Sequence, residues 1–257
     1  MQVSTLTPPP TNLSPAPPLS APPEPGHAYI PPLSQSAMPA WLAYLWYEFV
    51  YWTAMAFTTF GFGLRISGRQ NIPRRGPALL IANHQSFLDP IVVGISPPRH
   101  ICFLARKTLF KNRFFANLLS SLNTVPVDQE GVAKEGLKTI LEELNRGEAV
   151  LVFPEGQRSW DGKLQPLKPG ILLLIKRTKA PIIPIGVAGA QHALPRGSSR
   201  VRFSPLFLPP TQASIAVAIG KPIDPARLAD MPRADVLKTL QDDLQKVFDQ
   251  AERLRRK

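Results

Sequence analysis

The sequence is poor in cysteine and in paired metal ligands. Cys102 is the single cysteine among 257 residues, so no disulfide can form within one chain. It lies in the apolar run Ile101-Cys102-Phe103-Leu104-Ala105, which predicts a buried strand residue and not a nucleophile. Four histidines are scattered along the chain without metal-site spacing: His27, His84, His100 and His192. We therefore expect neither a bound metal ion nor a cofactor.

Two common catalytic motifs are also missing. The chain has no Gly-x-Ser-x-Gly elbow, so a serine hydrolase is unsupported. The stretch from Gly156 to Gly162-Lys163 has the wrong spacing for a phosphate-binding loop, and Leu164 stands where such a loop requires serine or threonine.

Acidic side chains are few. The chain has 18 aspartates and glutamates against 30 lysines and arginines, a formal charge of +12, which implies an anionic partner. Both nucleic acid and a membrane surface with acidic lipids meet that description. However, the aromatic residues gather in an apolar segment with few positive charges, whereas single-strand binding interleaves the two. We therefore expect a membrane surface with anionic lipids and no nucleic acid.

Residues 1–39 are rich in proline, serine, alanine and threonine. Glu24 is their single charged side chain, so this stretch lacks the apolar surface that would offset the entropy of ordering. We expect a disordered, partly polyproline tail. The tail has neither the basic start nor the apolar core of a secretory signal, so the domain that follows should remain in the cytoplasm.

Residues 40–64 are the most hydrophobic and aromatic segment and predict a membrane-anchoring helix. The length would allow a transmembrane helix of about 20 residues. Yet polar-tipped side chains fall at i, i+3, i+4 and i+7 on one helical face: Tyr44, Tyr47, Glu48 and Tyr51. This pattern favours an interfacial or re-entrant helix over a single span, with a buried core helix as a third alternative. Gly61 and Gly63 predict a bend in its second half.

Residues 65–257 alternate apolar runs of strand length with helical patterns. Strands are expected at 78–82, 101–105, 124–127, 149–152, 182–187, 201–208 and 213–220. Helices are expected at 131–146, from Pro169 to Arg177, and at 233–257, with an aromatic stripe at helical spacing in 109–122. The pattern predicts one α/β domain with a mixed central sheet flanked by helices, whose chemistry lies where the strands end.

The first polar block is Asn83-His84-Gln85-Ser86-Phe87-Leu88-Asp89-Pro90, directly after the apolar run 78–82. His84 and Asp89 are five positions apart, so neither a helix nor a strand brings their side chains together. A turn can do so, with the carboxylate fixing the imidazole tautomer and leaving the other nitrogen as a base. The alternative is structural, with Asp89 as a helix N-cap before Pro90.

The second block is Phe153-Pro154-Glu155-Gly156-Gln157-Arg158-Ser159, after the apolar run 149–152. The Arg158 fork at a strand end suits a phosphate, since it donates two parallel hydrogen bonds. The alternative is a local Glu155–Arg158 ion pair that stiffens the loop.

Together the two blocks resemble the membrane-associated glycerolipid acyltransferases typified by bacterial 1-acylglycerol-3-phosphate acyltransferase. Two weaker blocks follow the family order, Thr124-Val125-Pro126-Val127-Asp128-Gln129 and the apolar strand 180–187, and the resemblance covers roughly 64–224. One position departs from the pattern, because Gln129 stands where the family usually has arginine.

The resemblance implies roles for individual residues. His84 would be the general base and Asp89 would orient it. Arg158 and Lys107, with Arg106, would bind the acceptor phosphate, and Glu155 would fix Arg158 or contact the acceptor's glycerol. Gly156 and Ser159 belong to the same binding block.

The implied reaction is acyl transfer from acyl-CoA or acyl carrier protein to a lysophospholipid. The expected acceptor is 1-acylglycerol-3-phosphate, giving phosphatidic acid at the cytoplasmic face of the cell membrane. Gln129 leaves another lysolipid or glycerol phosphate open as the acceptor. A non-catalytic lysolipid-binding protein and a basic nucleic-acid-binding protein are the alternatives from other classes.

Overall fold

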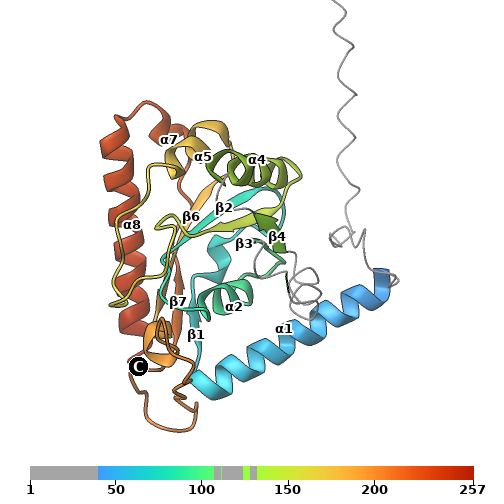
Figure 1. Cartoon of the computed structure of the whole chain (residues 1–257), viewed down its shortest axis with the longest axis vertical. Helices are drawn as coiled ribbons and strands as arrows, with labels where there is room; N and C mark the ends of the chain where they lie inside the picture. The colour runs from blue at the N-terminus through green and yellow to red at the C-terminus, as the bar shows by residue number, and fades with distance from the viewer. Residues whose placement is uncertain (1–39, 107–110, 112–123, 128–131) are drawn as a thin grey trace, which may run out of the picture. The chain divides into compact units, whose positions relative to one another are not determined.

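The computed structural model describes residues 40–106, 111, 124–127 and 132–257 (Figure 1). Within them one seven-stranded sheet has the order β1-β7-β6-β2-β5-β3-β4. Its strands are β1 (Arg65–Ser67), β2 (Ala78–Ala82), β3 (Cys102–Arg106), β4 (Thr124–Val127), β5 (Ala149–Val152), β6 (Ile182–Ala188) and β7 (Ala216–Ile219). All neighbours pair in parallel except β6 and β7, which are antiparallel. The prediction of a mixed central sheet is confirmed.

Helices cover both faces of this sheet (Figure 1). They are α1 (Ala40–Phe62), the 3-10 turn η1 (Arg69–Asn71), α2 (Asp89–Gly94), α4 (Val132–Asn145), α5 (Ile171–Arg177), α6 (Ala190–Ala193), α7 (Ala226–Ala229) and α8 (Arg233–Leu254). The helices expected at 131–146, 169–177 and 233–257 correspond to α4, α5 and α8.

Strand β2 lies at the centre of the sheet and is buried on both sides, as its unbroken apolar run predicts. Leu79 and Ile81 face a core formed with α4, α5 and α8. Leu80 and Ala82 face the opposite core, which includes α2 and the end of α1. Because β2 is fixed on both faces and paired on both edges, the loop that follows it begins from a rigid position.

The C-terminal helix α8 packs directly on β6 and β7. Its inward side chains Val236, Leu240, Leu244 and Val247 are buried, as their spacing predicts. Gly186 of β6 allows this close approach, since a Cβ there would lie 2.3 Å from the carbonyl oxygen of Val247. Glycine is required at this position by packing rather than by a turn.

Helix α1 is continuous through Gly61 to Phe62, so the predicted bend is wrong. Its polar-tipped face packs on the domain. The Tyr47 ring lies 3.7 Å from the His100 ring, and the Tyr51 hydroxyl donates to the carbonyl oxygen of Ile95 at 3.1 Å. The opposite face is exposed: Trp41, Leu45, Phe49 and Trp52 are 54–65% accessible. Aromatic side chains therefore lie on both faces of the helix, with Tyr47 and Tyr51 against the domain and Trp41, Phe49 and Trp52 exposed.

A search for helices with the length and apolar character needed to cross a bilayer finds none in residues 40–106, 111, 124–127 and 132–257.

The strand expected at 201–208 is absent, and this prediction is wrong. The segment is a loop whose backbone amides bond elsewhere, Arg202 N to Ala193 O and Ser204 N to Gly61 O, both at 2.8 Å. Pro205 lacks an N–H and cannot donate to a ladder. The strand expected at 213–220 is shorter, Ala216–Ile219, and the edge strand β1 was not predicted.

Several predicted features lie outside the described residues. They are the tail 1–39, the stripe 109–122, Lys107, Asp128 and Gln129.

Candidate active site

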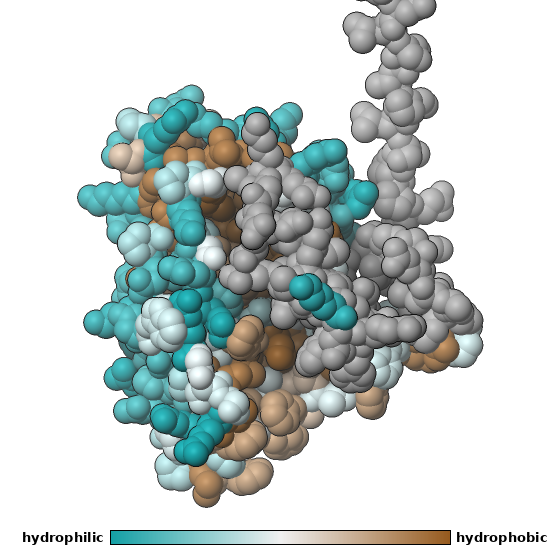
Figure 2. Space-filling model, in the orientation of Figure 1, coloured by the Kyte–Doolittle hydropathy of each residue, from teal (hydrophilic) through white to brown (hydrophobic). Residues whose placement is uncertain are grey.

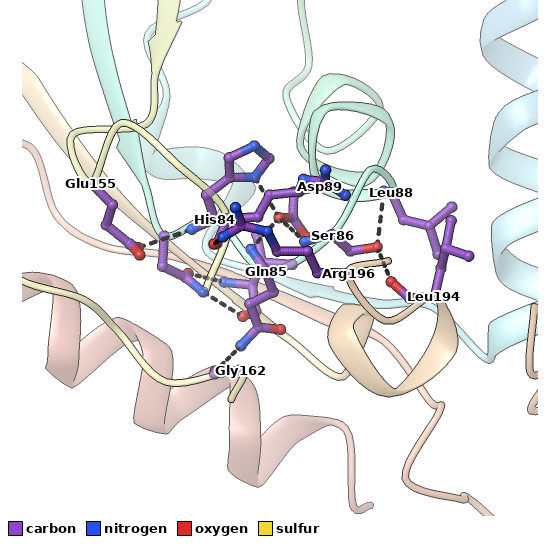
Figure 3. A network of polar contacts seen from close by, with 12 residues as sticks. His84, Gln85, Ser86, Leu88, Asp89, Glu155, Gly162, Leu194 and Arg196 are labelled. Atoms are coloured by element: carbon purple, nitrogen blue, oxygen red, sulfur yellow. Dashed lines mark hydrogen bonds and ion pairs between the residues drawn. The ribbon is translucent and has the colours of Figure 1, made fainter. Parts of the chain in front are cut away.

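The site begins where β2 ends. His84 follows Asn83 at the carboxyl end of β2, the edge of the sheet where β5 and β3, both parallel to β2, also end. The His84 Nδ1 atom lies 2.8 Å from Oδ2 of Asp89, which is fully buried (Figure 3). The imidazole remains 18% exposed. A turn therefore brings the two side chains together, as predicted from their spacing.

The turn is held by the same carboxylate oxygen. Asp89 Oδ2 also accepts hydrogen bonds from the backbone amides of Gln85 and Ser86, the latter at 2.7 Å. Asp89 is the first residue of α2, and the N-cap is Leu88, which makes no side-chain capping bond. The N-cap interpretation of Asp89 is therefore wrong. Its charge is instead directed at the imidazole and at two peptide dipoles.

This arrangement fixes the histidine tautomer. Because the Asp89 carboxylate accepts from Nδ1, the ring carries its proton there and presents the lone pair of Nε2. In the part of the chain that the structure describes, Nε2 accepts no hydrogen bond. The Phe153 ring stacks on the imidazole, 4.1 Å between centroids and 17° between planes. The ring is thus oriented as a general base would need to be.

The second block holds His84 by its backbone. Glu155 Oε1 accepts from the His84 amide at 2.9 Å, and the Ser159 amide donates to the His84 carbonyl at 2.8 Å (Figure 3). Glu155 Oε2 accepts from the Gln165 amide at 3.3 Å. The two blocks that the sequence separates by about seventy positions are therefore one hydrogen-bonded unit.

Glu155 is a buried carboxyl group with an altered pKa. Burial raises its pKa to about 7, and the nearby carboxylates Asp89 and Asp161 add to the rise. The two backbone amides act in the opposite direction because they stabilise the charged form. The Glu155 pKa is therefore well above the range of an ordinary carboxyl group.

Arg158 lies at the other side of the same loop. Its guanidinium carbon is 3.6 Å from the centroid of the Phe87 ring, so the two blocks also meet through a cation–π contact. Its backbone carbonyl accepts from the Arg196 guanidinium, which itself lies 4.1 Å over the Trp160 ring. The Glu155 oxygens accept from two backbone amides, so Glu155 fixes the His84 loop; its expected roles toward Arg158 or the acceptor's glycerol stay predictions.

Gly156 and Ser159 have structural roles in this loop. Gly156 has φ +72°, and its amide closes a turn onto the carbonyl of Phe153 at 3.0 Å. A Cβ at Gly156 would also meet the Lys168 side chain at 2.9 Å. The Ser159 hydroxyl is buried, and the Ser159 backbone amide donates to the His84 carbonyl oxygen.

Three further residues shape the site, and the sequence reasoning gave them no role. Asn83 extends the sheet beyond β2: its Nδ2 donates to Val187 O at 2.9 Å and its Oδ1 accepts from Val187 N at 2.7 Å. Gln85 Nε2 donates to the carbonyl of Gly162 (Figure 3). Asn83 and Gln85 flank His84, so two polar residues directly after a buried strand could have indicated that they belong to the site. Arg196 lies far along the chain, and no local pattern points to it.

Two of the expected phosphate-binding cations, Arg106 and Lys107, belong in sequence to the end of β3, which is separated from β2 by β5. β3 ends at Arg106, on the same edge of the sheet as the end of β2. The side chain of Arg106, together with Lys107 and Gln129, lies outside the described residues.

Comparison with known proteins agrees with this geometry. Residues 63–188 match the family model described as Acyltransferase, which spans both polar blocks and β1 to β6. The chain carries an acyltransferase domain of this family. The resemblance inferred from the two blocks is confirmed, and the binding-only and nucleic-acid alternatives are set aside.

Two relatives show how much of the chain is similar in sequence to known acyltransferases. The chain is 26% identical over 183 residues to the 1-acyl-sn-glycerol-3-phosphate acyltransferase of Bacillus subtilis (strain 168), spanning 71% of this chain and 84% of that protein. It is 30% identical over 161 residues to the chloroplastic acyltransferase BAT2 of Brassica napus, spanning 62% of this chain and 44% of that protein.

A solved structure has the same fold as this chain. It is the 1-acyl-sn-glycerophosphate (LPA) acyltransferase PlsC from Thermotoga maritima, with a TM-score of 0.63 and 22% identity over 84% of each chain. At this identity the likeness establishes the α/β architecture, including the helices that flank the sheet.

Proposed function

We propose that this acyltransferase domain moves an acyl group from a thioester to the free hydroxyl of 1-acylglycerol-3-phosphate, giving phosphatidic acid. The observation that carries the proposal is the His84 Nδ1–Asp89 Oδ2 contact at 2.8 Å, with the carboxylate fully buried and the imidazole 18% exposed to solvent. The names of the relatives support the choice of acceptor, since those from Bacillus subtilis and Brassica napus both act on 1-acyl-sn-glycerol-3-phosphate by name.

The chemistry follows from the tautomer. Nε2 of His84 takes the proton of the acceptor hydroxyl while the oxygen forms a bond to the acyl carbon. The C–S bond then breaks, and the departing thiolate takes the proton back from the imidazolium. Asp89 stabilises the imidazolium during the step. A positioned base of this kind contributes roughly 10²- to 10⁴-fold in rate. The thioester is already activated, so the scheme needs no metal or cofactor, which remains a prediction.

Arg158 is the proposed phosphate ligand. Its planar guanidinium suits bidentate donation to two phosphate oxygens, and it lies 3.6 Å from the centroid of the Phe87 ring. Arg106, the last residue of β3, and Lys107, the next residue in the sequence, are proposed as further cations, because β3 ends on the edge of the sheet that carries His84. Glu155 acts on the reaction indirectly, by holding the His84 backbone.

The acyl donor is proposed to be acyl-CoA or acyl carrier protein. The membrane is proposed to be one with anionic lipids, met at the cytoplasmic face of the cell membrane. Support for a membrane surface comes from the formal charge of +12 and from the outward aromatic face of α1, where Trp41 and Phe49 are 65% and 62% exposed.

The test is to incubate the purified, detergent-dispersed protein with labelled acyl-CoA, or acyl carrier protein, and a panel of acceptors. The panel contains lysophosphatidate, zwitterionic lysolipids and glycerol 3-phosphate, with His84→Ala as the inactive control. We expect labelled phosphatidate. If a zwitterionic or phosphate-free lysolipid is preferred, and Gln129→Arg moves the preference toward lysophosphatidate, the acceptor named here is wrong.

A further inference from the structure

The loop at residues 203–208 exposes an unusual amount of apolar surface. Phe203, Leu206, Phe207 and Leu208 are 53%, 43%, 79% and 58% accessible. These side chains lie side by side in sequence, whereas exposed apolar residues on soluble surfaces are normally scattered. The loop is outside the residues matched by the family model, so the proposed chemistry does not account for it.

The loop is tied to the end of α1. The Ser204 amide donates to Gly61 O at 2.8 Å and the Leu206 amide donates to Phe60 O at 3.1 Å. The Phe203 ring stacks on Phe62, with centroids 5.4 Å apart and planes 18° apart. The loop therefore cannot fold its outer side chains into the core without breaking these contacts.

Loop and helix end together form one apolar surface, which we call the apolar edge. Its exposed members are Phe57, Phe60, Phe203, Leu206, Phe207 and Leu208. Figure 2 shows brown and tan side chains gathered along the lower border of the molecule, where α1 ends and the loop projects in Figure 1. The surface is built from two segments far apart in the sequence, which the Ser204–Gly61 and Leu206–Phe60 hydrogen bonds hold together.

The charges beside the apolar edge select its partner. Between residues 194 and 212 the chain carries Arg196, Arg200 and Arg202 and no acidic residue, and Arg200 and Arg202 are exposed. A second copy of this chain, related by a two-fold axis, would present the same surface. These arginines would then lie opposite the arginines of the other copy, and like charges repel. A membrane with anionic lipids has an apolar hydrocarbon region beneath negatively charged headgroups, so it suits both the apolar side chains and the arginines. The occupant that fits both properties is a bilayer.

The segment that carries the loop also borders the active site. The Ser86 hydroxyl donates to Leu194 O at 2.8 Å, and the Arg196 guanidinium donates to the carbonyl of Arg158. The Arg202 amide donates to Ala193 O at 2.8 Å. A short run of backbone therefore links the apolar edge to the loop that holds His84.

We propose that the apolar edge, with Arg200 and Arg202, is a second bilayer contact that enters the interface of an anionic membrane beside α1 and sets the active site against the lipid. The docking proposal rests on the proposed function only for the statement that docking sets the active site against the lipid. Binding to vesicles itself requires no turnover. The exposed face of α1 alone leaves the domain free to roll about the helix axis, and a second contact beside the helix end removes that freedom.

The first test measures partition onto vesicles of phosphatidylglycerol and phosphatidylethanolamine. The double variant Phe207→Ser, Leu208→Ser should bind about tenfold more weakly or worse, because two apolar side chains no longer enter the lipid. Leu173→Ser is the matched control, since Leu173 is 46% exposed on α5 and should bind as the unmodified protein does. Equal partition of all three proteins would overturn the proposal.

Activity separates this proposal from the proposed function. The double variant should keep its turnover on a short-chain, water-dispersed acceptor and lose it on acceptor embedded in vesicles. Loss on both, in a variant that remains folded by circular dichroism, would mean that the loop acts in catalysis and not in docking. An unmodified protein that binds vesicles but acylates no acceptor would refute the proposed function and leave the docking surface standing.

A second test reports insertion directly. Cys102 is fully buried and burial raises the pKa of its thiol to about 12, so a new surface cysteine is labelled selectively. Phe207→Cys carrying a polarity-sensitive dye should shift to the blue with anionic vesicles, and labelled Leu173→Cys should not. Arg200→Gln with Arg202→Gln should weaken the preference for anionic over neutral vesicles. A blue shift that follows protein concentration without lipid would show self-association and overturn the proposal.

Discussion

Asp89→Asn tests the central claim about the site. The carbonyl of the new amide can occupy the position of Oδ2 and keep the hydrogen bonds from His84, Gln85 and Ser86. Its NH₂ then lies where Oδ1 is buried with no hydrogen-bond partner among the described residues. We expect the fold to survive with a loss of about 1–3 kcal/mol in the free energy of unfolding, the cost of one unsatisfied buried donor.

The kinetic effect is larger, because the charge is lost. A carboxylate about 4 Å from the imidazolium charge contributes roughly 4 kcal/mol at an effective dielectric constant of about 20. Since about 1.4 kcal/mol corresponds to a factor of ten, kcat for acyl transfer should fall by about three orders of magnitude. The KM for the acceptor should change little, because Asp89 is fully buried and cannot touch it.

The assay follows release of free thiol from the acyl thioester in the presence of acceptor. Asp243→Asn is the control, because Asp243 forms a surface ion pair with Lys246 on α8 and its charge has no part in the reaction. His84→Ala should be as impaired as the double variant with Asp89→Asn, since the pair acts as a unit. A folded Asp89→Asn protein with kcat within about tenfold of the unmodified protein would refute the role given to this pair.

The remaining predictions concern phosphate binding, pH and packing. Arg158→Lys keeps the charge and loses the planar fork, so the KM for the acceptor should rise more than the KM for the thioester; steady-state kinetics with equal rises would make Arg158 structural. Burial raises the pKa of Glu155 from 4.5 to about 7, so the folded state keeps a proton that the unfolded state loses, and stability falls as pH rises through that interval. Glu155→Gln cannot ionise, and its free energy of unfolding relative to the unmodified protein should rise by roughly 3 kcal/mol between about pH 4.5 and pH 8 in urea titrations; a pH-independent difference would contradict the buried carboxyl. Gly186→Ala places a Cβ against the backbone of Val247 and should lower the melting temperature, with a loss of about 3 kcal/mol; an unchanged melting temperature would show that β6 and α8 can move apart.

Several features of the fold follow from local patterns. β2 is an unbroken apolar run because it is buried on both faces, and α8 places its apolar residues at helical spacing because one face meets the sheet. The strand expected at 201–208 failed for a non-local reason. Its amides bond to α1 and to the end of α6, and a sequence pattern cannot indicate that such partners will be present.

The active site divides in the same way. Spacing alone indicated that a turn could join His84 to Asp89 and that regular structure could not. The roles predicted for Glu155, fixing Arg158 or contacting the acceptor's glycerol, stay predictions. Its contact with the His84 amide, 71 positions away, had no local signal, because that contact depends on β2 and β5 being neighbours in the sheet.

The sequence by itself determined the reactive side chains, the strands that carry them and the apolar, aromatic character of α1, since each depends on residues that are close along the chain. Only the tertiary structure decided which face of α1 is exposed, where Arg196 lies, and that the loop at 203–208 extends the apolar surface of the helix end. These features depend on contacts between segments far apart in sequence, such as Ser204 with Gly61 and Arg196 with Arg158. No local periodicity encodes them, because the geometry arises from the order of strands in the sheet.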